Sequence, residues 1–218
     1  MNPVVARSWS RGLGRGFRKA LSWLARNWVW AVSLLSLAYL GFALLAPVLM
    51  AAGHPIIGRL IYAAYAPLCH QWPDRSYFLF GTRLEYSFDE LRSWLGTEVT
   101  RNYVGDQVLG YKTAMCQRCL AMFGMISVAG LLYGARARRG RVVTPLSWWI
   151  VGLLLVPVVV DGGGQLLGLW ESTWWSRSMT GMLFGIAWVG WVYPRLGNSM
   201  TEVLLSLENH SRSEEVAV

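Results

Sequence analysis

Long apolar runs separated by charged segments form the main pattern of this 218-residue chain. The first run, residues 28–50, has no charged residue and is long enough, as a helix, to cross about 30 Å of hydrocarbon. Three later runs, residues 116–135, 145–169 and 175–193, have similar lengths and few charges. The pattern predicts an all-α integral membrane protein with about four transmembrane helices.

The positions of the basic residues predict how these spans are oriented. The net charge is +8, and the excess lies in residues 1–27 and in a cluster between the second and third runs, Arg136, Arg138, Arg139 and Arg141. Lys and Arg are enriched at the cytoplasmic ends of membrane spans. With four spans, both clusters and both termini fall in the cytoplasm, and residues 52–115 lie outside. The charge therefore indicates a membrane surface and no nucleic-acid partner.

Residues 56–80 form a fifth apolar stretch, and we interpret residues 56–67 within it as a short helix. The stretch is interrupted by charged residues, prolines and a histidine: Arg59, Pro67, His70, Pro73, Asp74 and Arg75. Counting it as a span would move the basic cluster to the side opposite the basic N-terminus, against the usual charge asymmetry. We therefore expect a short interfacial helix here, followed by a loop, on the extracytoplasmic side.

The remaining segments flank a single membrane domain, residues 28–195. In residues 1–27, four apolar positions share one face of a basic amphipathic helix suited to anionic lipids of the inner leaflet: Leu13, Phe17, Leu21 and Leu24. Residues 196–218 form a cytoplasmic tail with a short amphipathic helix, begun by the capping-box pair Ser199 and Glu202. This last helix either rests on lipid or docks to a partner.

The three cysteines form the first candidate site, because all of them fall on the extracytoplasmic side. Cys116 and Cys119 are spaced as Cys-x-x-Cys at a helix start, and Cys69 is followed directly by His70. Three Cys and one His are a ligand set for zinc or another transition metal. Disulfide or redox thiol chemistry, and simple burial, remain open as alternatives. A c-type haem is excluded at this motif, since Leu120 stands where the haem-ligating His would be.

Polar residues inside the apolar runs form the second candidate site. Asp161 and Gln165 share one helix face near the outer end of the third run, and Arg118 and Arg177 begin the second and fourth runs at the same depth. A buried carboxylate in a membrane is costly unless it is paired or used. Asp161 therefore either pairs with an arginine to fix the bundle or serves a functional site. We expect these residues and the cysteines to form one polar site facing the outer leaflet.

Five ordered motifs carry a resemblance to a known family. They are Cys69-His70-Gln71, Arg75-Ser76-Tyr77-Phe78, Cys116-Gln117-Arg118-Cys119, Asp161-Gly162 with Gln165, and Arg177-Ser178-Met179-Thr180-Gly181. In this order the chain resembles the domain-of-unknown-function family 2085 of prokaryotic integral membrane proteins. It departs from the family at residues 120–123, where Thr-Gly-Ile-Tyr is usual, and residues 82–114 look like an insertion. The resemblance implies a prokaryotic plasma membrane and a genuine site, but it supplies no activity.

Two functional hypotheses follow. In the first, the chain has a Cys/His/Asp site for metal binding or thiol redox chemistry, with four catalytic candidates: Asp161, Arg177, Arg118 and Gln165. In the second, it is an accessory or structural subunit of a larger respiratory or photosynthetic membrane complex, and the same residues hold the fold together. The chain has no P-loop, dinucleotide-binding motif, HExxH or Ser-His-Asp order, so it supports no standard reaction class.

Overall fold

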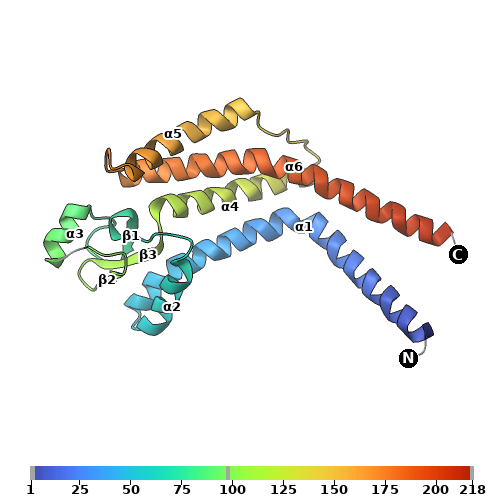
Figure 1. Ribbon diagram of the computed structural model, residues 1–218, viewed down its shortest axis with the longest axis horizontal. Coiled ribbons are helices and arrows are strands. Elements are labelled where there is room, and N and C mark those ends of the chain that lie inside the picture. Colours follow the sequence, from blue (N-terminus) through green and yellow to red (C-terminus); the bar gives the residue numbers. More distant parts are fainter. Residues whose placement is uncertain (1–2, 97–98, 217–218) are drawn as a thin grey trace.

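Four long helices form the body of the molecule (Figure 1). The computed structural model describes residues 3–96 and 99–216. The long helices are α1 (Pro3–Ala51), α4 (Gln117–Arg138), α5 (Trp148–Leu166) and α6 (Trp174–Val216). Both chain ends and the connection between α4 and α5 lie at one end of this bundle, and the shorter elements gather at the other (Figure 1). We call the second end the sheet end.

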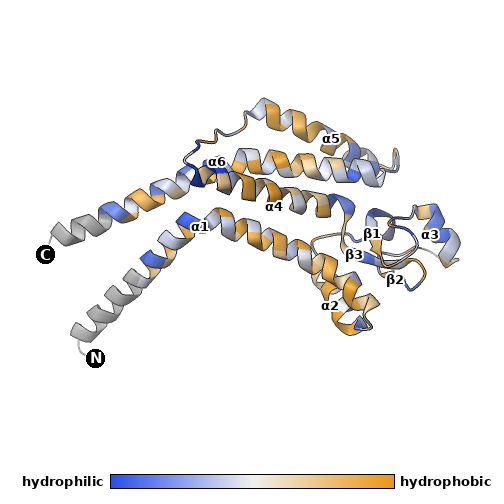
Figure 2. Cartoon of the chain, turned by 180° about the vertical axis from the view of Figure 1, so that it is seen from behind, coloured by the Kyte–Doolittle hydropathy of each residue, from blue (hydrophilic) through white to orange (hydrophobic). Residues whose placement is uncertain are grey.

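Three helices in the described part of the chain are long and apolar enough to cross a membrane. They are residues Gly16–Ala51 of α1, then α4 and α5, and Figure 2 shows apolar residues along much of their length. Helix α6 packs along α4, but its first half is rich in Trp, Gly, Ser and Thr and is less apolar. A fourth span in α6 therefore stays a prediction.

Helix α6 does not end with the predicted fourth run at residue 193, but continues through Pro194 to Val216, so no separate helix begins in the tail. Proline lacks the N–H group that would bond to the carbonyl of Gly190, one turn earlier. In the structure this carbonyl accepts a hydrogen bond from the N–H of Leu146 at 3.0 Å. The exchange satisfies the carbonyl and ties the segment before α5 to α6. At the opposite terminus, α1 runs unbroken through the predicted flank and the first span, and the side chain of Leu13 lies outside the described part of the chain.

The all-α prediction is wrong at the sheet end, where a helix and a loop were expected. The short helix is present as α2 (Pro55–Tyr65), but the following residues form a 3-10 turn, η1 (Pro73–Arg75), and a small sheet. Its strands are β1 (Ser76–Leu79), β2 (Gly105–Asp106) and β3 (Gly110–Cys116), in the antiparallel order β1-β3-β2. Strands this short show little alternation, and their partners are distant in sequence, so no local pattern reveals them.

Residues 82–114, which look like an insertion in the sequence, contribute most of a small folded unit. Helix α3 (Phe88–Leu95) begins with a capping box between Ser87 and Glu90. Five buried side chains form a core between α3, the loops and the sheet: Phe78, Tyr86, Leu91, Val99 and Leu109. This core gives strand β3 a fixed position before it passes directly into α4.

Helices α4 and α6 approach closely at Gly181 and Gly185 of α6, whose Gly-x-x-x-Gly spacing is typical of tightly packed membrane helices. A Cβ atom added at Gly181 would lie 2.3 Å from the carbonyl oxygen of Arg118, and one at Gly185 would lie 2.9 Å from that of Met122. Helix backbone therefore meets helix backbone here. The contact brings the first turns of α6 beside the N-terminus of α4.

We expect Gly181→Ala to destabilise the protein by about 1–3 kcal/mol, because the added methyl group must push α6 away from α4. Gly152→Ala is the matched control, since a Cβ at this helical position meets nothing within 4 Å and alanine favours helix. Thermal unfolding of both purified variants in detergent measures the difference. Equal unfolding midpoints would contradict the close approach.

Candidate functional site

Three cysteines from two distant segments meet at the sheet end of α4. Cys116 is the last residue of β3 and the N-cap of α4, Cys119 lies in the first turn of α4, and Cys69 follows α2. Their Sγ atoms all lie within 4.8 Å of one another, and all three thiols are free. We call these residues the cysteine triad. The predicted proximity of Cys69 to the Cys-x-x-Cys pair is confirmed.

The start of α4 explains the arrangement of the triad. The N-cap residue and the third helical residue lie on the same side of the first turn, so the side chains of Cys116 and Cys119 are neighbours. The N–H group of Cys116 points at the Sγ atom of Cys69, 3.2 Å away. Hydrogen bonds from the Cys116 and Cys119 thiols hold the pKa of the Cys69 thiol far below its ordinary value. The triad is therefore suited to carry one negative charge, on Cys69, with Cys116 and Cys119 as its protonated donors, and the positive helix N-terminus also favours that charge.

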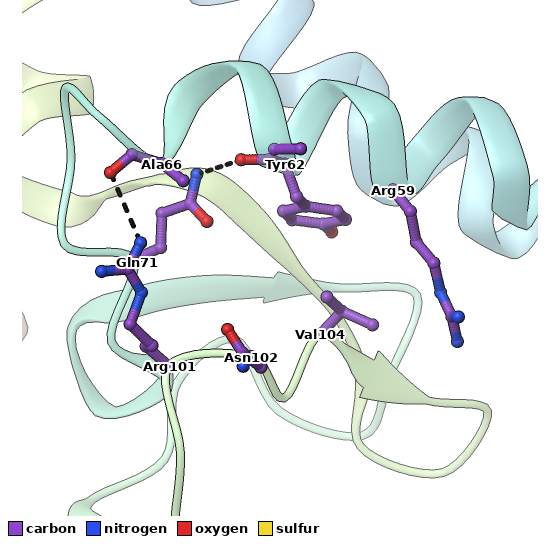
Figure 3. Close-up of a pocket in the computed structure, with 8 residues that line it drawn as sticks. Arg59, Tyr62, Ala66, Gln71, Arg101, Asn102 and Val104 are labelled. Atoms are coloured by element: carbon purple, nitrogen blue, oxygen red, sulfur yellow. Dashed lines mark hydrogen bonds between the residues drawn. The ribbon is translucent and has the colours of Figure 1, made fainter.

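A buried glutamine holds the turn that carries Cys69. Gln71 has a left-handed backbone with φ of 55°, and its Nε2 group donates to the carbonyls of Tyr62, at 2.9 Å, and Ala114, at 3.0 Å. Figure 3 shows Gln71 and Arg101 beside α2, where Arg101 donates to the carbonyl of Ala66. The amide of Gln71 thus joins α2 to β3 and fixes the Cys-His-Gln turn between them.

Lys112 supports the same turn, and sequence reasoning missed it. Its side chain is fully buried, and its Nζ group donates to the carbonyls of Gln71, at 2.5 Å, and Arg101, at 2.6 Å. Burial lowers the pKa of Lys112 to about 7. No sequence pattern signals this role, because both acceptors are backbone carbonyls of distant residues.

Asp161 of α5 pairs with Arg118 of α4, one of the two arginines that the sequence suggests as partners. The Nε group of Arg118 also donates to Thr180 Oγ1 of α6 at 3.2 Å. Arg118 therefore connects three helices at the level of the triad. Both side chains of the ion pair are largely buried, with 27% of Arg118 and 14% of Asp161 exposed.

Arg177, the other predicted arginine, is 3% exposed and lies at the start of α6. Its Nη1 group donates to the carbonyl of Asp74 at 2.7 Å and to Gln117 Oε1 at 3.2 Å. Gln117 is fully buried and also donates to the carbonyl of Ser76 at 3.3 Å. Sequence reasoning assigned Gln117 no role, although it lies inside the Cys-x-x-Cys motif. It links β1, α4 and α6.

A cavity of about 210 Å³ adjoins the triad. His70 and Gln165 line it, together with the arginines of α4 and α6. His70, the predicted fourth ligand, is exposed. Among the described residues, the cluster of possible ligand atoms within 4.8 Å of one another contains the three cysteines of the triad and does not include His70. The structure therefore gathers the predicted candidates around one cavity, with Asp161 held through Arg118.

The buried lysine leads to a pH dependence of stability. Unfolded chains keep the ordinary lysine pKa of 10.5, whereas Lys112 in the fold titrates at about 7. Between these values the unfolded chain binds a proton that the folded chain has released, so raising the pH across this window adds stability. We expect Lys112→Met to gain less stability than the parent protein between about pH 7 and about pH 9.5.

Thermal unfolding at several pH values tests the role of Lys112. Lys19→Met, which changes the chain's other lysine at an exposed position, is the matched control and should follow the parent. A parallel pH profile for Lys112→Met would contradict the burial argument.

Comparisons with known proteins agree with the motifs. An uncharacterized protein of Methanocaldococcus jannaschii is 28% identical over 138 residues, which cover 63% of this chain and 69% of that protein. No solved structure matches significantly. Residues 107–190, which include Cys116, Cys119, Asp161 and Arg177, match the model of the family described as predicted membrane protein, DUF2085, and this match confirms the resemblance predicted from the sequence.

Proposed function

We propose that this chain is a four-span membrane protein that binds a transition-metal ion, preferably zinc, at the cysteine triad on its extracytoplasmic side. The observation that carries the proposal is the approach of the three Sγ atoms to within 4.8 Å of one another. Tetrahedral zinc with bonds of about 2.3 Å holds its sulfur ligands about 3.8 Å apart, so only a small contraction of the triad is needed. Thiolate ligands suit zinc, and the N-terminus of α4 favours the thiolate form.

A tetrahedral metal site needs a fourth ligand besides the three cysteines, and one histidine that lines the cavity could supply it. His70 lines the same cavity as the triad and follows Cys69 directly. When His70 binds, the site has the closed three-Cys, one-His ligand set of structural zinc. When it does not, the cavity leaves a position open for water or substrate, as in catalytic zinc sites.

Three features support a fourth span in α6. Residues 174–193 are long enough, at about 1.5 Å per residue, to cross the hydrocarbon core. The helix also packs along α4, a candidate span itself. Finally, a fourth crossing puts Arg195, just beyond this stretch, on the same side as the basic N-terminal segment and the cluster at residues 136–141, as the charge asymmetry of membrane proteins favours.

Reporter fusions test this topology. A fusion within α3, at Glu90, should report the extracytoplasmic side, and a fusion at the C-terminus should report the cytoplasm, because an even number of spans returns the chain to its starting side. A fusion in the loop at Gly140 is the control and should agree with the C-terminus. If the Glu90 and C-terminal fusions reported the same side, the four-span arrangement would be wrong.

Thiol redox chemistry is a second candidate function, favoured by the free Cys-x-x-Cys pair at a helix N-terminus. A reactive cysteine needs a lowered pKa, and that of Cys69 is lowered by hydrogen bonds from its two neighbours. In this case two thiols of the triad would give two electrons and two protons to an external oxidant as they form a disulfide. Metal content and thiol oxidation state separate the two functions.

The exposed surface of α5 bears on the accessory-subunit hypothesis. This helix packs mainly against α6 and exposes large apolar side chains, among them Trp149, Leu153 and Val159. Lipid covers such a surface as well as a neighbouring subunit does, so α5 does not favour a complex over a lone protein in the bilayer.

We expect the purified protein to hold about one zinc ion per chain, measured by elemental analysis after removal of loosely bound metal. Replacing any member of the triad by serine should abolish this content, because two thiolates bind zinc far more weakly than three. His70→Ala reports on the fourth position, with His54→Ala, an exposed histidine outside the cavity, as its matched control. Metal-free protein in which a triad disulfide forms would contradict the metal proposal and favour redox chemistry.

A further inference from the structure

We propose that the cavity beside the cysteine triad binds a small oxyanion, a carboxylate or a tetrahedral oxyanion such as phosphate or sulfate. The inference deepens the proposed function by naming the ligand class of the same site. It rests on the site described above but not on the presence of the metal.

Unpartnered donors at this cavity carry the inference. The Nε and Nη2 groups of Arg177 and the Nε2 group of Gln165 are buried and make no hydrogen bond within the described part of the chain. Both residues line the cavity. Buried polar groups in native proteins almost always have partners, and an unmade bond to a buried charged donor is costly. Because all three orphaned groups are donors, the missing partner is rich in acceptors.

The geometry of the Arg177 guanidinium restricts the chemical class of the ligand further. Its Nη1 group is already held by the carbonyl of Asp74 and by Gln117. The two remaining groups, Nε and Nη2, form one edge of the planar guanidinium, which binds two oxygens of a single carboxylate, phosphate or sulfate at once. A ligand with two oxygens on one central atom fits this edge better than a single hydroxyl or carbonyl.

The charge balance around the cavity also favours an anion. Arg118 is paired with Asp161, and Arg75 lies 3.3 Å from Asp74. Arg177 makes no salt bridge with any residue that the structure describes, and no described Asp or Glu lines the cavity. The carboxylates of Asp74 and Glu171 act on Arg177 only from beyond ion-pair distance, so a singly charged anion would supply the direct ion pair that this buried cation lacks among the described residues.

Arg177 also lines a second cavity, whose other charged residues are mostly acidic. Four acidic residues line that space of about 340 Å³: Asp74, Glu85, Glu90 and Glu171. An anion is repelled from that side, so the triad side is the one that accepts it. The volume of the triad cavity, about 210 Å³, is small for a drug-sized ligand and suits a small ion with some water. The anion would then lie beside the sulfur atoms, where a metal or a thiolate can act on it.

Titration of the protein in lipid nanodiscs with inorganic phosphate, sulfate and acetate tests the inference, with chloride at equal ionic strength as reference. We expect at least one oxyanion to bind and to raise the unfolding temperature, whereas chloride does not. Gln165→Glu keeps the size of the side chain but replaces a donor by a negative acceptor, so it should weaken binding by about tenfold or more. Gln107→Glu makes the same change at an exposed residue outside the cavity and should bind as the parent does.

Two further measurements keep the outcomes distinct. Arg177→Lys retains the charge but loses the two-donor edge and should also lose affinity; if it fails to fold, Gln165→Glu still decides the question. Zinc content is measured on the same samples, so oxyanion binding without zinc would refute the metal proposal and leave this inference standing. Zinc binding with no oxyanion preferred over chloride, or full affinity in Gln165→Glu, would overturn the inference and leave the metal proposal intact.

Discussion

Gln71 joins the segment after α2 to strand β3 through two hydrogen bonds from one buried amide group. Its left-handed backbone costs on the order of 1 kcal/mol, which persists because the side chain and the bond from Lys112 hold the residue in place. Strand β3 passes directly into α4, so fixing the turn against β3 also fixes Cys69 relative to the other two thiols. The spacing of the triad is thus a property of the folded sheet end and not of a flexible loop.

Much of the site could be predicted from the sequence, because it depends on local helix formation and on the depth of each residue in the membrane. An uncharged run such as residues 28–50 has to be helical in a bilayer, because no water satisfies its backbone. A carboxylate in an apolar run needs a cation at its own depth, and Arg118 meets that need at Asp161. The approach of Cys69 to the Cys-x-x-Cys pair was predictable because hydropathy assigns all three residues to the same end of the spans.

Other features depend on contacts that no local pattern contains. Strands of two to seven residues acquire their identity from partners across the sheet, and β3 is buried on nearly all sides. From the sequence alone, Lys112 would be expected at the surface. In the fold it is buried, and its Nζ group donates to the carbonyls of Gln71 and Arg101. Pro194 ends a helix in isolation, but the Leu146 N–H takes the place of its missing donor. In each case tertiary structure supplies a partner and reverses the local preference.

The difference between a closed and an open site bears on whether the sheet end is only a scaffold. A structural zinc site binds four protein ligands and leaves no space beside the ion. Here three sulfur atoms adjoin a cavity that the buried Arg177 also lines, and the Nε and Nη2 groups of Arg177 have no hydrogen-bond partner among the described residues. Uncompensated buried donors cost stability, and a protein that needed only rigidity would gain by pairing them. Their retention beside the thiols is better explained by a ligand that supplies the missing acceptors than by a purely structural role.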